Sequence, residues 1–134
     1  MTTIKLKIVT PREVFLEDEF EMVTLPSFEG ELAILKDHVP ILASLKAGQI
    51  NIYLNGVVAK KIIINSGVLN FSNNEAIILV EEVISKEKYH NEFITNKISE
   101  LQNNISNYVK IGDDEALNKE QQSLNDILTI KELL

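Results

Sequence analysis

The chain has 134 residues, 45% of them apolar and 25% charged, which is typical of one globular domain or of a small domain with an appendage. Its net charge of −7 is spread along the chain, which contains a single arginine, Arg12, and no basic cluster. We therefore expect no nucleic-acid partner, because neutralising phosphates requires concentrated lysine and arginine. The lack of cysteine excludes disulfides, zinc–thiolate sites and thiol nucleophiles.

The N-terminal residues alternate charged and apolar side chains, which is typical neither of a signal peptide nor of a transit peptide. One of the longest apolar runs, Ala76–Val80, is far too short to span a bilayer. We therefore expect no direct membrane insertion, and any association with a membrane must come through a protein partner.

Short strands are predicted along residues 1–84. Ile4, Leu6 and Ile8 alternate with lysines, the pattern of a half-buried strand. Asn55-Gly56 predicts a tight hairpin turn, because both residues tolerate positive φ. The other predicted strands are 14–16, 20–25, 50–54, 57–59, 62–64, 68–71 and 76–80, with a loop over 26–30. So many short strands at close spacing predict a β-sandwich, or flattened antiparallel β-barrel.

The period changes at Ser85. Apolar residues then recur at steps of four and three, one stripe of a helix: Ile94, Ile98, Leu101, Ile105 and Tyr108. Gly112 suits a left-handed helix end and Asp113 suits the N-cap of a second helix. So short a connection predicts an antiparallel α-helical hairpin at about 86–133. The sequence therefore predicts two domains, a β-sandwich over 1–84 and a helical hairpin over 85–134.

Two histidines could carry chemistry. His38 lies near Glu29, Glu31 and Asp37 in the sequence, so a metal or acid–base site is one interpretation. One histidine with scattered carboxylates is a weak signal, and a role in packing or capping a loop is favoured. His90 is expected on the solvated face of a helix.

Other catalytic patterns are missing from the sequence. Ser66-Gly67 follows Asn65 instead of the glycine that a nucleophile elbow requires, and the five glycines form no phosphate-binding loop. We therefore expect no catalytic residue, no cofactor and no metal ion.

A resemblance to a known family rests on the stretch Leu25–Pro40, which reads LPSFEGELAILKDHVP. It resembles the signature of F-type ATP synthase epsilon subunits, roughly Leu-Pro-Gly-x-x-Gly-x-Leu-Gly-Ile-Leu-x-x-His-x-Pro, with the spacing kept throughout. The segments Lys7–Pro11, Ile41–Gly48 and Ser66–Leu69 also resemble the family's first strand, following turn and later strand start. The resemblance covers almost all of residues 1–84.

The resemblance implies a non-catalytic subunit of the central stalk, which couples proton-driven rotation of the c-ring to ATP synthesis in the catalytic head. The implied partners are the gamma subunit, the polar loops of the c-ring, which carry basic residues in this family, and the catalytic head through the hairpin. The implied location is the cytoplasmic face of the bacterial inner membrane, as a peripheral subunit. The implied interface residues are Glu29, Gly30, Glu31, Leu32, Ala33, His38 and Pro40.

The chain departs from the family pattern in several places. Ser27 and Ala33 replace glycines, and Lys36 replaces a common proline. The hairpin contains no arginine and no match to the family's nucleotide motif, Ile/Leu-Asp-x-x-Arg-Ala. We therefore expect neither tight ATP binding nor strong inhibition of the catalytic head, and we expect the hairpin to stay folded against the sandwich.

Two other functions remain open on the residues themselves. A β-sandwich with a helical lid could be a free binding module for a small ligand or another protein. Co-purification with gamma would distinguish the ATP synthase subunit from such a module. A sandwich-fold hydrolase or isomerase could use His38 and Glu31, which metal analysis and an activity screen would test.

Overall fold

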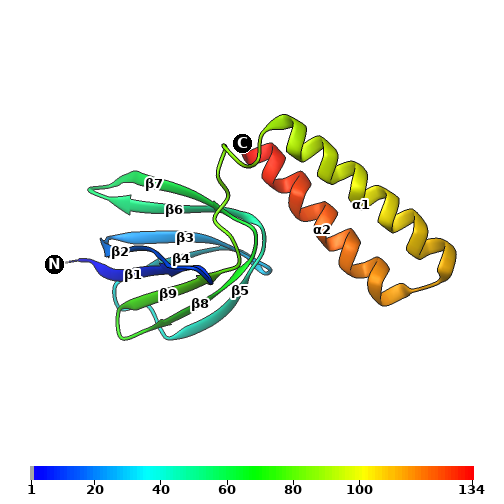
Figure 1. Ribbon diagram of the computed structural model, residues 1–134. Helices are drawn as coiled ribbons and strands as arrows, with labels where there is room; N and C mark the ends of the chain where they lie inside the picture. Colours follow the sequence, from blue (N-terminus) through cyan, green and yellow to red (C-terminus); the bar gives the residue numbers. More distant parts are fainter. Residues whose placement is uncertain (1) are drawn as a thin grey trace. The chain divides into compact units, whose positions relative to one another are not determined.

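The computed structural model describes residues 2–134, which divide into two compact units at Val83/Ile84. The first unit is a curled sheet in which most neighbouring strands are antiparallel, and the second unit is a pair of helices (Figure 1). The predicted fold class, a β-sandwich or flattened barrel followed by a helical hairpin, is confirmed.

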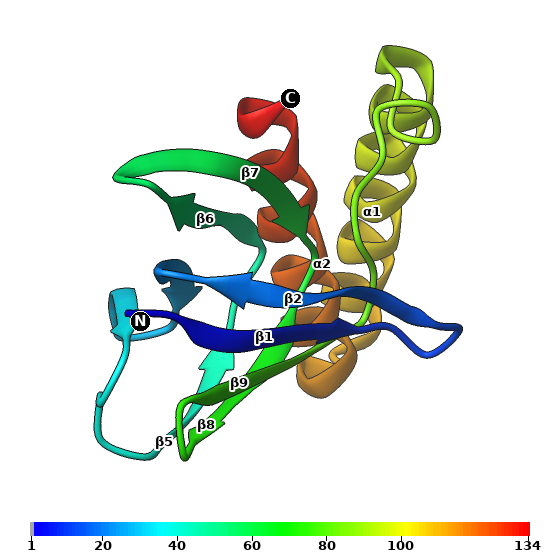
Figure 2. The same cartoon turned by 90° about the vertical axis from the view of Figure 1, so that its left-hand side faces the viewer.

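Nine strands form the sheet of the first unit: β1 (Ile4–Val9), β2 (Val14–Phe20), β3 (Met22–Ser27), β4 (Gly30–Leu35), β5 (Ile41–Leu45), β6 (Gly48–Leu54), β7 (Val57–Ile64), β8 (Gly67–Ser72) and β9 (Glu75–Val80). Their order is β2-β1-β9-β8-β5-β3-β6-β7, and β4 pairs with β3. Figure 2 shows β1 lying between β2 and β9, and its pairing with β9 is parallel. One residue pair, Ser27 with Leu45, joins the two halves of the sheet at β3 and β5.

The core of this unit lies inside the curl. Alternate residues of the strands point inward, so that β1 buries Ile4, Leu6 and Ile8 and exposes or half-exposes the residues between them. The same cluster takes Val23 and Leu25 from β3 on the other half of the sheet. Because both halves contribute to one cluster, burial of apolar surface stabilises the curl.

The predicted loop over 26–30 is wrong at both ends. Pro26 and Ser27 belong to β3 and Gly30 begins β4, which leaves a two-residue turn between them. The Pro26 carbonyl accepts from Lys46 N (2.9 Å), so it points away from β4. In a strand, the nitrogen of a residue points to the same side as the carbonyl of that residue. The missing N–H therefore falls on the side away from β4.

Two strands, β4 and β5, have no counterpart among the strands predicted from periodicity. The predicted strands 57–59 and 62–64 are one strand, β7, at the edge of the sheet. Lys60 and Lys61 lie on its exposed part, and the β6–β7 register shifts next to Tyr53. Charges and a bulge on an edge strand oppose pairing with other chains. Lys60 and Lys61 are therefore compatible with the middle of an edge strand, although their charge suggested a break between two strands.

The second unit is formed by helices α1 (Asn91–Ile111) and α2 (Asp114–Leu133), which pack against each other. Gly112 adopts the left-handed conformation (φ 74°), and the Asp113 carboxylate accepts from Ala116 N at 3.1 Å. The predicted stop and restart between the helices is confirmed.

The first helix begins later than predicted, at Asn91 instead of about residue 86. A turn precedes it, in which Ser85 O accepts from Tyr89 N (3.0 Å). The His90 backbone is extended, and its Nδ1 accepts from Phe93 N at 3.3 Å. His90 is therefore the N-cap of α1, and its expected place on a solvated helix face is wrong.

Candidate functional site

The residues singled out from the sequence fall into two groups at opposite ends of β4. Glu29 lies in the β3–β4 turn and Glu31 lies near the start of β4, whereas His38 and Pro40 lie in the loop 36–40 between β4 and β5. At about 3.4 Å per residue, the six-residue strand separates its two ends by roughly 17 Å. These residues therefore form two surfaces instead of one site, which we call the β3–β4 turn and the β4–β5 loop.

The β3–β4 turn presents charge and one aromatic side chain. Glu29 and Glu31 are exposed, and Phe28 between the strands is 60% exposed. Ser27 Oγ donates to Gly30 O (2.5 Å), which ties the two ends of the turn together. Gly30 has φ 124°, a conformation that favours glycine. The turn therefore has a defined backbone conformation and presents the exposed carboxylates of Glu29 and Glu31 to solvent.

Within β4 the predicted interface residues alternate between faces. Leu32 is half-buried and packs against the core, while Ala33 on the opposite face is exposed. Ala33 pairs with Thr24 of β3. Of the two, Ala33 is the residue on the face available to a partner.

His38 is held in the β4–β5 loop by its own chain. Its Nδ1 lies 2.7 Å from Val39 O, and its ring packs edge-on against the buried Phe71 at 6.0 Å between centroids. Glu31 lies near the far end of β4, so the acid–base pair proposed for a hydrolase or isomerase is not assembled. Within residues 2–134, no group of three or more histidine, aspartate or glutamate side chains is arranged to hold a metal ion.

An apolar surface on the outer face of β5, β8 and β9 was not predicted from the sequence. Leu42 is 72% exposed, Leu79 is 54% exposed and Val68 is 39% exposed. Val68 pairs with both Ser44 and Leu79, so the three strands carry these side chains on one face, opposite the core residues Ala43, Leu69 and Ile78. We call Leu42, Val68 and Leu79 the outer strip. Val68 and Leu79 are direct neighbours, and Leu42 lies diagonally from Val68 because its own partner is Asn70. We take this face as the candidate interaction surface, since exposed apolar side chains that gather on one face are typical of such surfaces.

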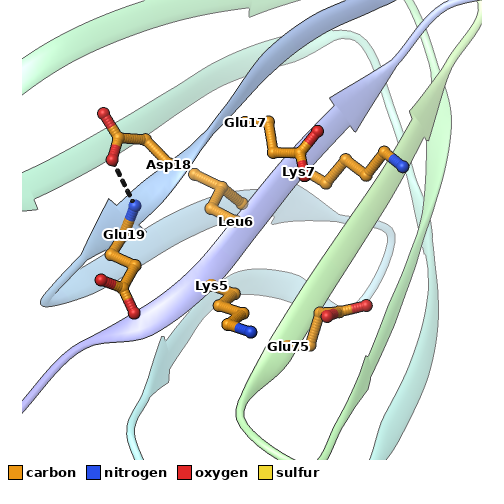
Figure 3. Close-up of a pocket in the computed structure, with 7 residues that line it drawn as sticks. All are labelled: Lys5, Leu6, Lys7, Glu17, Asp18, Glu19 and Glu75. Atoms are coloured by element: carbon orange, nitrogen blue, oxygen red, sulfur yellow. Dashed lines mark hydrogen bonds between the residues drawn. The ribbon is translucent and has the colours of Figure 1, made fainter.

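A shallow depression of about 300 Å³ lies over β2, β1 and β9 (Figure 3). It is lined by Lys5, Leu6, Lys7, Glu17, Asp18, Glu19 and Glu75. Lys5 pairs in register with Glu19 and Glu75, and Lys7 pairs with Glu17. The depression is thus the solvated face of three strands, where lysines lie opposite glutamates. Opposite charges across neighbouring strands stabilise the pairing of those strands, so we interpret the depression as part of the sheet and not as a ligand site.

Comparison with known proteins decides the family. Residues 3–86 match the model of the ATP synthase delta/epsilon chain β-sandwich domain. The chain belongs to the ATP synthase delta/epsilon chain family. It is an epsilon chain, a non-catalytic subunit of ATP synthase.

Curated relatives named ATP synthase epsilon chain support this membership. The chain from Rickettsia bellii is 35% identical over 105 residues, which cover 77% of this epsilon chain and 97% of the relative. The chain from a Nitratiruptor species is 39% identical over 100 residues, 75% of this chain and 78% of the relative. Both relatives are bacterial.

A solved structure shares the whole fold. A chain in the Euglena gracilis mitochondrial ATP synthase superposes with a TM-score of 0.76 and 18% identity, covering 98% of this chain and 81% of that one. At this identity the likeness concerns the fold alone. In the described part of the epsilon chain, neither helix is long and apolar enough to cross a membrane.

Proposed function

We propose that the first unit of this epsilon chain docks to two partners and so couples c-ring rotation to ATP synthesis in the catalytic head. The outer strip and the β4–β5 loop bind the gamma subunit, and the β3–β4 turn rests on the polar loops of the c-ring. The single observation that carries the proposal is the outer strip, because a surface that transmits torque must be complementary and well packed. The chain would then be peripheral, at the cytoplasmic face of the membrane.

The division of partners follows the chemistry of the two surfaces. The outer strip is apolar, and burying it against gamma removes leucine and valine side chains from water. The β3–β4 turn instead presents Glu29 and Glu31, which suit basic loops. Separate surfaces for gamma and for the c-ring allow one rigid unit to contact both partners at once.

The contribution of the turn is tested by reversing its charge with Glu29→Lys and Glu31→Lys together. Exposed turn residues usually change the free energy of unfolding by less than about 0.5 kcal/mol, so the fold should persist. Like charges brought together at an interface cost several kcal/mol, so we expect proton-driven ATP synthesis in reconstituted membranes to fall several-fold. Glu13→Lys with Glu87→Lys makes the same change of net charge at exposed sites elsewhere. Normal coupling in the Glu29/Glu31 variant would mean that these carboxylates are merely solvated.

We infer that the helical hairpin neither binds ATP tightly nor strongly inhibits the catalytic head. A triphosphate needs several free cations or a nest of amides, but residues 85–134 carry six lysines against nine acidic residues. Lys97 lies 3.8 Å from Glu100, and the Lys88 ammonium lies 5.5 Å from the centre of the Tyr89 ring. The start of α2 is acidic as well, with Asp113 at its N-cap and Asp114 and Glu115 in its first turn.

Two measurements test this inference. Calorimetry with millimolar ATP should show no saturable binding to the full-length chain, since the nine acidic residues of the hairpin outnumber its six lysines and repel the triphosphate. Hydrolysis of ATP by the catalytic head should change less than twofold when residues 85–134 are removed, because this segment contains no arginine and three more acidic residues than lysines. Micromolar ATP binding, or a several-fold rise in hydrolysis on truncation, would refute the inference.

A further inference from the structure

Asn74 connects three parts of the first unit that are distant in the sequence. It lies in the turn between β8 and β9, where Asn73 and Asn74 both have positive φ (51° and 58°), the conformation of a tight hairpin turn. Its backbone carbonyl accepts from Lys5 N at 2.9 Å, which fixes the turn to β1. The Asn74 side chain is therefore held on an anchored backbone.

That side chain reaches the β4–β5 loop. Asp37 N donates to Asn74 Oδ1 at 2.6 Å, and Asn74 Nδ2 donates to Asp37 Oδ1 at 3.2 Å. The two hydrogen bonds close a ring between residues 37 positions apart. Asp37 has φ 65°, a left-handed conformation that is uncommon outside glycine, although aspartate and asparagine adopt it more readily than other residues.

The ring lies directly beside the part of the β4–β5 loop that we propose docks to gamma. His38 follows Asp37, and Val39 and Pro40 after it are exposed. On the β4 side, the loop is held by His38 N donating to Leu35 O at 3.2 Å. The pair of Asp37 and Asn74 therefore fixes the backbone from which His38, Val39 and Pro40 project.

We propose that Asn74 is a positioning residue for the docking of the gamma subunit. It touches no partner itself; it holds Asp37 in its left-handed conformation and so presents the β4–β5 loop in its bound shape. Ordering the loop in advance lowers the entropic cost of association. This inference rests on the proposed function of the loop.

The test exchanges the amide of Asn74 and the carboxylate of Asp37 between the two positions. Asn74→Asp removes the Nδ2 donor and places a second carboxylate against that of Asp37, so we expect the affinity for the cognate gamma subunit to fall about tenfold. Asp37→Asn combined with Asn74→Asp rebuilds the ring with amide and carboxylate exchanged, and should restore affinity to within about twofold of the unchanged chain. Asn73→Asp adds the same charge to the same turn without touching Asp37, and should bind normally. Affinity is measured by calorimetry, and thermal unfolding is followed for every variant.

Several outcomes would overturn the proposal. One is normal binding by Asn74→Asp, and another is equal weakness of the single and double variants, which would show that restoring the hydrogen-bonded ring does not restore binding. If Asn74→Asp does not fold, Asn74→Gly replaces it, because glycine keeps the positive φ without the side chain.

A second measurement separates this inference from the proposed function. If the unchanged chain does not bind gamma, the docking proposal fails. Hydrogen exchange in the free chain then decides the positioning role, because Asn74→Asp should accelerate exchange of the Asp37 and His38 amides and Asn73→Asp should not. Equal exchange in the two variants would refute a positioning role for Asn74.

Discussion

Replacing Leu42 and Leu79 together with glutamate is expected to lower the affinity for the cognate gamma subunit by about a hundredfold or more. Large side chains buried at the centre of an interface contribute about 2 kcal/mol each, and the new carboxylates would also have to be desolvated. In the free chain these side chains are 72% and 54% exposed, so the fold should be unaffected.

The control for this variant is Val57→Glu. Val57 is 63% exposed on β7, outside the outer strip, so a carboxylate there changes surface charge and apolar area without touching the proposed interface. Surface plasmon resonance against immobilised gamma measures both variants. Full affinity in the Leu42/Leu79 variant, or equal losses in the two variants, would show that gamma does not bind at the outer strip.

Gly67→Ala is expected to lower the free energy of unfolding of the first unit by about 3 kcal/mol, and its melting temperature by roughly 15 °C. A Cβ at this position would lie 2.4 Å from the carbonyl oxygen of Leu79 and 3.2 Å from Cγ1 of Val80. The carbonyl belongs to the neighbouring strand β9 and cannot move without breaking the β8–β9 ladder. The expected loss of stability therefore comes from a steric clash with β9.

Gly56→Ala is the matched control for Gly67→Ala. Gly56 has φ 76° and open space around it, so alanine there costs about 1 kcal/mol through backbone conformation alone. Thermal and urea unfolding compare the two. A Gly67→Ala variant no less stable than Gly56→Ala would mean that β8 and β9 separate easily, which contradicts the close strand approach described above.

What could be predicted from the sequence was the local chemistry. Gly112 and Asp113 each have one strongly preferred role at helix ends, and the Asn55-Gly56 pair forms the β6–β7 turn with positive φ at both residues (56° and 76°). These features depend on near neighbours, so residue types are enough to assign them. The fold class followed from the many short strands before Ser85 and from the change of period at that residue.

What could not be predicted depends on pairing between distant segments. Pro26 is compatible with β3 only because its carbonyl faces Lys46, which the local pattern does not reveal. The outer strip exists because β5 pairs with β8 and β8 with β9, which places Leu42, Val68 and Leu79 on one face. The link between Asp37 and Asn74 likewise joins two turns whose sequences give no sign of each other.

The central claim is that this epsilon chain docks to the gamma subunit of its own ATP synthase. Titration of the purified cognate gamma subunit with the full-length chain in a calorimeter tests the claim most directly. We predict saturable binding at one-to-one stoichiometry with a negative heat-capacity change, the signature of buried apolar surface. Absence of binding at micromolar concentrations, or binding with no heat-capacity change, would contradict docking through the outer strip.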